Sequence, residues 1–424
     1  GTAMRFIHCA DIHLDSPLRG LEFYDGAPAE EMRHATRRAF ANVVDLAIDR
    51  AADFVLIAGD IFDGDWPDFN TGLYFASQLR RLADANIRVF LIHGNHDAVS
   101  KLTKSVPLPR NVFSFPANRP ATEVIESLGV AIHGQSFASE SVTTDLSAAY
   151  PAPHAGLLNI GLLHTALSGR EGHQPYAPTS ADRLTDKGYD YWALGHVHCR
   201  EIVRASPWIV FPGNTQGRHA RETGAKGCMV VEAEPGVGIH SAEFVPTDVA
   251  RWHQIGIDIA DLSSEDDLHA AVQAQVRATQ VSAEDRILAL RLTLSGRGTL
   301  HHSIVSNREA IRAQLAASIG EASAGMAWLE KVRIKLTAPL DLPRLAERDD
   351  PIGLLIRSLE SLQADPGTLQ ALAESVLSDL GQKLPPELRG SDSAWALDSP
   401  EALADALVNA RERLLAAIAA EDAT

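Results

Sequence analysis

Five short runs of polar residues within the first 198 residues constrain this chain more than any other feature. Each run offers carboxylate, amide or imidazole groups, and nearly every one closes a short apolar stretch of strand length. Such groups, with no thiolate among them, suit hard or borderline divalent metals. Their number is too large for one ion and about right for two. The runs are Asp11-Ile12-His13, Gly59-Asp60-Ile61-Phe62-Asp63, Gly94-Asn95-His96-Asp97, the single His164, and Gly195-His196-Val197-His198.

Each run has an ordinary structural explanation when it is taken alone. His164 lies in an apolar stretch and could be a packed core histidine, and Asp11 and Asp60 could cap strand ends or helices. Gly94-Asn95 could be a plain turn, because both residues tolerate positive φ. The coincidence of all five runs favours a metal site instead. Two metal ions roughly 3.5–4 Å apart stabilise the attacking and leaving oxygens of a displacement at phosphorus, so the pattern predicts a two-metal phosphoesterase.

The five runs, in this order, resemble the calcineurin-like metallophosphoesterase superfamily, whose pattern is D-x-H, G-D-x-x-D, G-N-H-[DE], H and G-H-x-H. Every block is present and no ligand position is substituted. The resemblance implies a β-sandwich flanked by helices, with Asp60 as a carboxylate that bridges two ions. It further implies that one ion is held by Asp11, His13, Asp60 and His198, and the other by Asp60, Asn95, His164 and His196.

Further residues beside the ligand runs are candidates for catalysis and substrate binding. His96 directly follows a ligand and is expected to protonate the leaving oxygen, since imidazole titrates in the useful range. Asp97 is expected to orient His96. Asp63 is either a support for the ligands or a turn carboxylate. The loop 212–219 places Arg218 and His219 near the last ligand pair as candidate substrate contacts, with a turn bearing a solvated arginine as the alternative.

Within the superfamily, the runs at 7–15 and 59–63 are most similar to SbcD-type DNA repair exonucleases of the YhaO-like bacterial branch. This similarity implies a DNA substrate, a dimer and an SbcC-like ATPase partner. It also implies two divalent ions, with Mn²⁺ expected and Fe²⁺, Zn²⁺ or Mg²⁺ as alternatives. Asp63-Gly64-Asp65 stands where protein phosphatases usually have Asp-Arg-Gly. The alternatives are a small-molecule or cyclic-nucleotide phosphodiesterase and a non-catalytic scaffold that keeps the metal fold.

The length of 424 residues is greater than one hydrophobic core ordinarily serves. The apolar periodicity predicts three regions. The first is an α/β layer fold in which strands deliver the ligand runs; the segment 208–232 is expected to close it as a hairpin. The predicted regions are a nuclease domain at 4–245, a small α/β cap domain at 246–340 and an acidic helical region at 341–424. Strands are expected at 4–10, 54–58, 87–92, 157–163, 191–194, 252–259, 286–294 and 331–336, and helices at 30–51, 70–85, 265–277 and 306–319.

The formal net charge of −17 argues against a general nucleic-acid coat, which would be basic. Residues 341–424 hold 16 acidic and 7 basic residues, so the remainder is less acidic. No apolar stretch approaches the roughly 20 residues of a membrane span, and no signal peptide is evident after Met4. Three cysteines, of which Cys9 and Cys199 are expected to be buried strand thiols rather than ligands, fit a reducing cytoplasm. Basic residues gather after the third and fifth runs: Lys101, Lys104, Arg110, Arg218, His219, Arg221 and Lys226.

The C-terminal region carries a helix signal and an apolar stripe. Ser399-Pro400-Glu401 predicts a helix start with a capping serine and proline in the first turn. The stripe either packs on this chain or offers a docking face to a partner helix. The chain has no G-x-x-x-x-G-K-[ST] loop, so ATP dependence would come from another subunit. The stripe consists of Leu403, Leu407, Ala410, Leu414 and Ile418.

Overall fold

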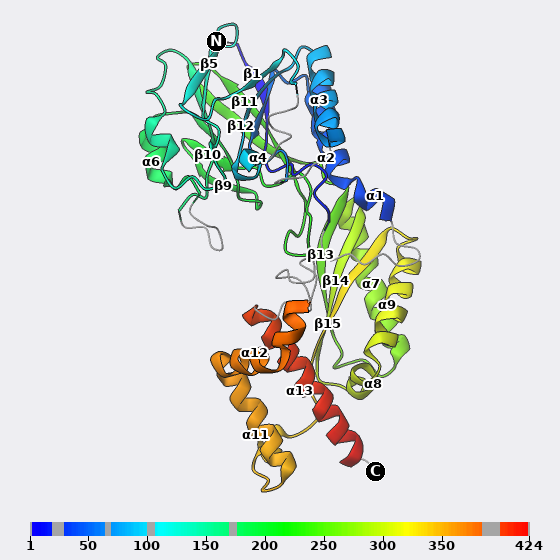
Figure 1. Ribbon diagram of the computed structural model, residues 1–424. Coiled ribbons are helices and arrows are strands. Elements are labelled where there is room, and N and C mark those ends of the chain that lie inside the picture. Colours follow the sequence, from blue (N-terminus) through cyan, green and yellow to red (C-terminus); the bar gives the residue numbers. More distant parts are fainter. Residues whose placement is uncertain are drawn as a thin grey trace. The chain divides into compact units, whose positions relative to one another are not determined.

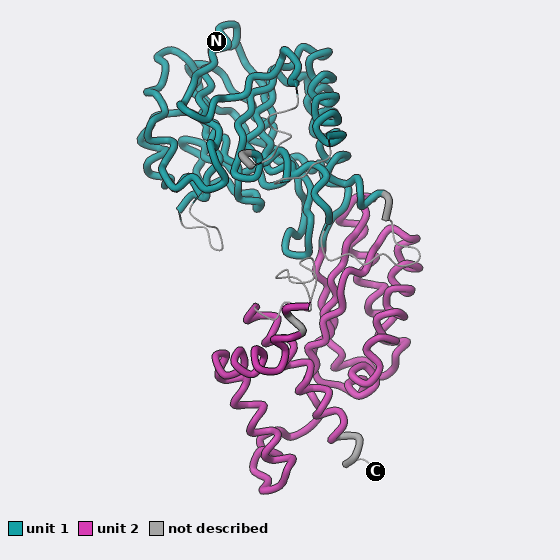
Figure 2. Tube along the Cα trace, viewed as in Figure 1, with its two compact units in different colours: residues 1–19, 29–252 teal, residues 20–28, 253–424 magenta. Residues whose placement is uncertain are grey.

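The structure, a computed structural model, describes residues 2–18, 29–63, 69–99, 107–168, 176–383 and 399–422. It forms two compact units, residues 1–19 with 29–252 and residues 20–28 with 253–424 (Figure 2). The first unit holds all five ligand runs. The second begins within a strand that follows them.

The first unit is a sandwich of two six-stranded sheets (Figure 1). In the first sheet the three strands that precede the first three ligand runs are parallel, a fourth parallel strand lies at one edge, and two antiparallel strands extend the sheet on the other side. Its strands, in spatial order, are β12 (Gly238–Pro246), β11 (Gly227–Glu234), β1 (Met4–Cys9), β2 (Phe54–Ala58), β3 (Arg88–Ile92) and β4 (Val112–Ser114).

The second sheet has a parallel centre and an antiparallel strand at each edge. The inner faces of the two sheets bury one apolar core, in which Phe6, Phe54 and Phe90 of the first sheet meet Ile160 and Tyr191 of the second. The strands are β5 (Ala121–Ile125), β6 (Val130–Gly134), β7 (Leu158–His164), β8 (Tyr191–Gly195), β10 (Trp208–Phe211) and β9 (Glu201–Ala205).

Helices cover the outer faces of both sheets. Phe40 of α2 and Phe75 of α3 pack with Val55 and Ile57 of β2, and Leu184 of α6 packs on the outer face of the second sheet. The predicted sandwich flanked by helices is therefore confirmed. The helix expected at 30–51 is two helices, because a turn at His34 separates them. The helical segments are α1 (Ala29–Arg33), α2 (Ala35–Asp49), α3 (Phe69–Asp84), α4 (Asn95–Val99), the 3₁₀ turn η1 (Leu146–Ala149) and α6 (Ala181–Asp186).

The segment 208–232 is not the hairpin that the sequence predicts. Strand β10 lies in the second sheet between β8 and β9, whereas β11 lies in the first sheet between β1 and β12. The connection between β10 and β11 therefore crosses from one sheet to the other. The loop with Arg218 and His219 lies in this crossing, and the crossing carries it to the metal-ligand end of the sandwich.

The second unit begins with a three-stranded sheet and its covering helices. Leu288, Leu290 and Leu292 of the middle strand pack on Val272 of α7 and Leu315 of α9. The predicted order of strands and helices is present, with one additional short helix. The elements are β13 (Ala250–Asp258), α7 (Glu265–Ala283), β14 (Ile287–Gly296), α8 (His301–Ser306), α9 (Arg308–Ala322) and β15 (Ala327–Leu336).

The C-terminal helices pack on this sheet and on each other. Leu415 of α13 is buried with Ala338 and Ile356, and Ala416 joins the core of the sheet. Ser399 Oγ accepts a hydrogen bond from the backbone N–H of Ala402, as the predicted cap requires. The helices are α10 (Leu342–Ala346), α11 (Pro351–Ala364), α12 (Pro366–Lys383) and α13 (Pro400–Asp422).

The C-terminal helix therefore docks within the chain, but its buried face coincides only partly with the predicted stripe, of which Ile418 packs on the same cluster as Leu415. Leu403 is buried as expected, whereas Leu414 is 41% exposed and its neighbours Leu415 and Ala416 are buried instead. The buried Glu412 on the same helix lies 2.8 Å from His301 Nε2 of α8. Among the described residues, no helix combines the length and the apolar content that crossing a membrane requires.

Candidate metal centre

The five ligand runs meet at one end of the sandwich, where parallel strands of both sheets end. Asp11 and Asp60 follow β1 and β2, and Asn95 follows β3 of the same sheet. His164 ends β7, and His196 follows β8, in the opposite sheet. Carboxyl ends of neighbouring parallel strands meet at one edge, so the two sheets together deliver ligands to one site.

Four of these residues hold a backbone conformation that side chains rarely adopt. The φ angles are 53° at Asp11, 44° at His13, 52° at Asp60 and 101° at His196. Positive φ outside glycine costs free energy and gathers at functional sites. Backbone hydrogen bonds hold the strained turn in place: Asp11 N–H donates to the carbonyl of Gly59 at 2.9 Å, and His13 N–H to that of Asp60 at 3.0 Å.

Two glycines of the runs are required by close approach to the ligands. Gly59 has φ of 91°, and a Cβ there would lie 2.5 Å from Nδ1 of His164. A Cβ on Gly94 would clash with Asp60 Oδ1 and with the His164 ring. These glycines therefore let three ligand-bearing segments approach one another more closely than any other residue would allow.

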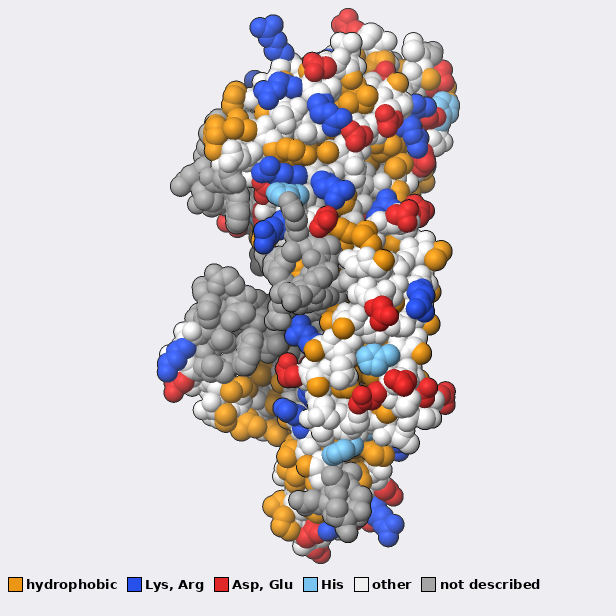
Figure 3. Space-filling model, turned by 90° about the vertical axis from the view of Figure 1, so that its right-hand side faces the viewer, with side chains coloured by type: hydrophobic (Ala, Val, Ile, Leu, Met, Phe, Trp, Pro, Cys, Tyr) orange, Lys and Arg blue, Asp and Glu red, His pale blue; other side chains and the backbone are white. Residues whose placement is uncertain are grey.

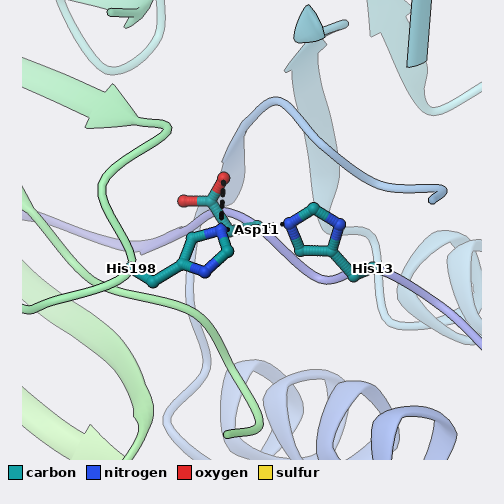
Figure 4. Close-up of side chains that lie close together, drawn as sticks. All are labelled: Asp11, His13 and His198. Carbon is teal, nitrogen blue, oxygen red and sulfur yellow. Dashed lines mark hydrogen bonds and ion pairs between the residues drawn. The ribbon is translucent and has the colours of Figure 1, made fainter. Parts of the chain in front are cut away.

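One group of ligands consists of Asp11, His13 and His198, whose ligand atoms all lie within 4.8 Å of one another. Figure 4 shows the two imidazoles converging beside the carboxylate. The Nε2 atoms of His13 and His198 are 3.2 Å apart, and His198 Nε2 lies 3.9 Å from Asp11 Oδ1. Two imidazole nitrogens and a carboxylate directed at one point are a donor set for a divalent metal.

A second group consists of Asp60, His164 and His196, with Asn95 beside it. His164 Nε2 lies 2.9 Å from Asn95 Oδ1 and 3.3 Å from Asp60 Oδ2, and His196 Nδ1 lies 3.3 Å from the same amide oxygen. Asp60 Oδ2 is also 3.9 Å from His13 Nε2 of the first group. Asp60 thus lies between the two groups, where a bridging carboxylate would be placed. The donor sets fit two divalent ions.

Burial and mutual charge determine the protonation of the ligands. Burial raises the pKa of Asp11 to about 7. The pKa of Asp60 lies well below its usual range despite its burial, because His164 and His13 surround it. Burial alone would lower the pKa of His164, yet the Asp60 carboxylate raises it to about 9. Burial lowers the pKa of His13 to about 4, which keeps that imidazole neutral and available to a metal.

The remaining nitrogens of three ligand histidines face oxygen atoms that fix their orientation. His164 Nδ1 lies 2.8 Å from the carbonyl of Ala58, and His13 Nδ1 lies 3.5 Å from Asp63 Oδ1. His198 Nδ1 lies 2.6 Å from Oε2 of Glu222, which is 6% exposed.

Glu222 is a residue that the sequence analysis missed. Its burial would raise its pKa, but His198 and Arg218 hold the pKa well below its usual range. Glu222 also accepts hydrogen bonds from Asn214 Nδ2 at 2.9 Å and from the backbone N–H of Arg218 at 3.0 Å. The one signal in the sequence is a single acid beside Arg218, His219 and Arg221.

His96 lies on the open side of the site. Its side chain is 40% exposed, compared with 1% for His13 and 25% for His198. Its backbone N–H donates to Asp60 Oδ1 at 3.0 Å. This placement leaves the ring accessible to a substrate and is consistent with its predicted role as a proton donor.

Asp63, and not Asp97, is the carboxylate beside His96, which corrects the predicted pairing. Asp63 Oδ1 lies 3.6 Å from His96 Nδ1. Asp97 is fully buried and accepts hydrogen bonds from the backbone N–H groups of Phe62 at 2.8 Å and Gly94 at 3.0 Å. Asp97 therefore fastens the second ligand run to the third.

Arg218 belongs to the wall of the site. Its Nη1 donates to Ser16 Oγ at 2.8 Å and lies 3.6 Å from Asp63 Oδ2, and Ser16 donates to the same carboxylate at 2.8 Å. The side chain is only 12% exposed. His219 Nε2 lies 3.6 Å from Glu222 Oε1. Substrate contact by Arg218 and His219 stays a prediction.

The lysines and cysteines that the sequence places near the ligand runs differ in their exposure and contacts. Lys226 is 8% exposed, and its Nζ donates to the carbonyl of His198 at 3.0 Å. Cys9 is buried as expected, but Cys199 is exposed, so the prediction that it is a buried strand thiol is wrong. Lys101 and Lys104 lie outside the described residues.

Comparison with known proteins agrees with this geometry. The family model described as calcineurin-like phosphoesterase matches residues 4–200, and the model described as metallophosphoesterase YhaO, middle domain, matches residues 252–337. The chain is 32% identical over 299 residues to the uncharacterized metallophosphoesterase YhaO of Bacillus subtilis, covering 70% of this chain and 72% of that protein. The chain belongs to the calcineurin-like metallophosphoesterases, in the YhaO-like family. The family resemblance seen in the sequence is thereby confirmed.

More distant relatives are archaeal proteins named DNA double-strand break repair protein Mre11. That of Methanopyrus kandleri is 26% identical over 302 residues, covering 64% of this chain and 62% of the relative. That of Sulfolobus acidocaldarius is 28% identical over 207 residues, covering 46% and 50%. A solved dimetal phosphatase from Danio rerio matches 57% of this chain and 97% of its own at 10% identity, but its TM-score of 0.34 is too low to support an argument.

Proposed function

We propose that this metallophosphoesterase hydrolyses phosphodiester bonds of DNA with two Mn²⁺ ions. The observation that carries the proposal is the convergence of two groups of imidazole and carboxylate ligands, with Asp60 within reach of both. The similarity to Mre11 proteins supports DNA as the substrate class. Mn²⁺ is proposed because carboxylate, amide and imidazole ligands all suit it.

The protein's own residues have distinct parts in this reaction. Two ions, when bound, would supply an activated water and neutralise charge that develops at phosphorus. Asp11, His13 and His198 would hold one ion, and Asn95, His164 and His196 the other, with Asp60 shared. His96 donates a proton to the leaving oxygen from the exposed side of the site. Asp63 orients His96 through its Nδ1.

The charge of the chain makes a partner part of the proposal. Phosphate contacts from Lys and Arg dominate affinity for DNA, whereas this chain has a net charge of −17. On the face shown in Figure 3, basic side chains alternate with acidic ones and form no continuous basic surface among the described residues. An SbcC-like ATPase, acting with a dimer of this chain, would supply the missing basic surface. Free thiols at all three cysteines fit a cytoplasmic location.

The proposal is tested by comparing substrates with the purified protein. End-labelled single- and double-stranded DNA, a chromogenic phosphodiester and cyclic nucleotides are each incubated with Mn²⁺, Mg²⁺ or Zn²⁺. We expect Mn²⁺-dependent release of nucleotides from DNA. Turnover of the chromogenic or cyclic substrates without any cleavage of DNA would favour a small-molecule phosphodiesterase. Binding of two ions without turnover of any substrate would favour a non-catalytic scaffold.

A further inference from the structure

A row of basic side chains lines one face of strand β15 in the second unit. Strand residues alternate between faces, and an irregularity in the pairing with β14 leaves Glu330 as the extra residue. Ile334 and Leu336 therefore join the apolar core, and Lys331, Arg333 and Lys335 lie on the opposite face.

Helix α13 closes a small pocket over this basic face. The pocket has a volume of about 60 Å³, several times the space that one water needs. The strand contributes Lys331, Arg333 and Lys335, and the helix contributes Asp405 and Asn409. Three cations and one carboxylate leave this pocket positive, in a unit whose last 84 residues are strongly acidic.

The basic groups of the pocket are only partly neutralised. Lys335 lies 3.7 Å from Asp405. The nearby Arg291 is fully paired, because its Nε and Nη2 each donate to Glu330 at 2.9 Å. Within the described part of the chain, no carboxylate lies within ion-pair distance of Lys331 or Arg333.

Two buried polar atoms of the pocket also lack hydrogen-bond partners among the described residues. These are the Nε of Arg333, a donor, and the Oδ1 of Asn409, an acceptor. A buried polar atom without a partner costs free energy. Burial and the charges of Arg291 and Arg333 lower the pKa of Lys331. An anion that also carries a hydroxyl would satisfy the donor, the acceptor and the excess charge together.

We infer that the pocket between β15 and α13 binds a phosphate group, with Arg333 and Lys331 as its cationic ligands and Asn409 accepting from a phosphate hydroxyl. Arginine suits this role because its planar guanidinium presents several donors to oxyanions. The group could belong to free phosphate or to the terminal phosphate of a nucleotide or a nucleic acid, which can each carry such a hydroxyl. The inference does not depend on the proposed function, since the pocket lies wholly in the second unit.

The test measures phosphate binding by isothermal titration calorimetry on the full-length protein. Inorganic phosphate is titrated into wild type, Arg333→Gln and Lys331→Gln. EDTA is present throughout, so that no metal ion in the metal centre contributes to phosphate binding. Arg344→Gln is the matched control, because it removes the same charge from an exposed position of the same unit. We expect saturable binding to wild type and to the control, weakened by roughly tenfold or more in Arg333→Gln.

Competition experiments then identify the source of the phosphate group. If a short single-stranded DNA with a 5′-terminal phosphate, or a nucleotide, displaces phosphate from wild type and binds Arg333→Gln more weakly, that molecule is the ligand. If neither displaces it, free phosphate is the ligand. Absence of saturable binding to wild type overturns the inference. So does unchanged affinity in both Arg333→Gln and Lys331→Gln while circular dichroism shows that each variant is folded.

Discussion

The Nδ1 atom of His198 lies 2.6 Å from Oε2 of the buried Glu222, so this ligand histidine is held by a carboxylate on the side away from the metal site. Such an arrangement fixes the ring and raises the basicity of the ligating nitrogen. Lys226 holds the backbone carbonyl of the same histidine at 3.0 Å. His198 is thus positioned at both its ring and its backbone.

Replacing Glu222 should weaken metal binding without unfolding the protein. We expect Glu222→Ala to lower Mn²⁺ affinity by about 10–100-fold, the usual effect of removing such a partner. Glu222→Gln should have a smaller effect because its amide oxygen can still accept from His198. Calorimetric titration with Mn²⁺ measures both. Glu232→Gln, on the outer part of β11, is the control; equal affinity in Glu222→Ala and this control would contradict the prediction.

Replacing Asp60 should remove the response to metal altogether. Asp60 lies 3.3 Å from His164 and 3.9 Å from His13, so neither ion keeps its shared ligand in Asp60→Ala. We expect this variant to lose metal-dependent hydrolysis and the rise in melting temperature that Mn²⁺ causes by binding the folded state. Asp45→Ala, which removes a surface carboxylate, should behave as wild type. Wild-type turnover by Asp60→Ala would refute the assignment.

Replacing His96 should separate catalysis from metal binding. The side chain lies on the open side of the site, 40% exposed, with Asp63 at 3.6 Å. We expect His96→Ala to bind two ions but to lose roughly 10²–10⁴-fold in kcat. The loss should shrink with a leaving group that needs no protonation. Loss of a bound ion, measured by metal analysis after gel filtration, would make His96 a ligand instead.

Buried His8 should make stability depend on pH. Its ring nitrogens lie 2.7 Å from Tyr191 Oη and 3.0 Å from the carbonyl of Leu194, and burial lowers its pKa from 6.5 to about 3. The unfolded chain therefore binds a proton below pH 6.5 that the folded chain refuses. The contribution of neutral His8 to the free energy of unfolding is complete above pH 6.5 and is lost as pH falls toward about 3.

The effect of His8 can be isolated by comparing how steeply the free energy of unfolding falls with pH in wild type and in His8→Gln. In urea unfolding with EDTA present, we expect the free energy of unfolding of wild type to fall by about 2–3 kcal/mol more than that of His8→Gln as pH falls by about two units below 6.5. His240→Gln, at a histidine whose side chain is 46% exposed, controls for a solvated imidazole. Equal slopes for wild type and His8→Gln would show that His8 does not resist protonation.

The sequence predicted the positions of the ligand runs because each ends or closely follows its own strand. Asp11, Asp60 and Asn95 needed only the local pattern of an apolar run ending in a polar residue, together with the rule that parallel strands end at one edge. The strained φ angles of Asp11 and Asp60 were not predictable, because the hydrogen bonds that hold these turns join segments distant in sequence.

The supporting residues were less predictable for the same reason. Glu222 reaches His198 only because the chain crosses from the second sheet to the first between β10 and β11, and a hairpin was expected there. Asp97 follows His96 directly, yet its carboxylate binds the backbone of Phe62 and Gly94. Adjacency in sequence did not indicate which side chain faces which.

The partner proposal makes a prediction about the exposed apolar side chains of the C-terminal helices. Leu354 on α11 and Val376 on α12 are 61% and 68% exposed, whereas Leu415 and Ala416 on α13 are buried. Deleting 399–424 would therefore uncover packed core and leave His301 without Glu412, so we expect that truncation to destabilise the second unit. It cannot test docking by itself.

Substitution of an exposed residue does test docking. We expect Val376→Asp to keep the wild-type melting temperature, since surface changes usually alter stability by less than about 0.5 kcal/mol, and to lose co-purification with the SbcC-like ATPase. Ser378→Asp adds the same charge to an exposed position on the other side of α12, and it should retain the partner. An apolar helix face that docks in a partner's groove tolerates a charge poorly. If Val376→Asp and Ser378→Asp co-purify with the ATPase equally well, the side of α12 that bears Val376 does not bind the partner.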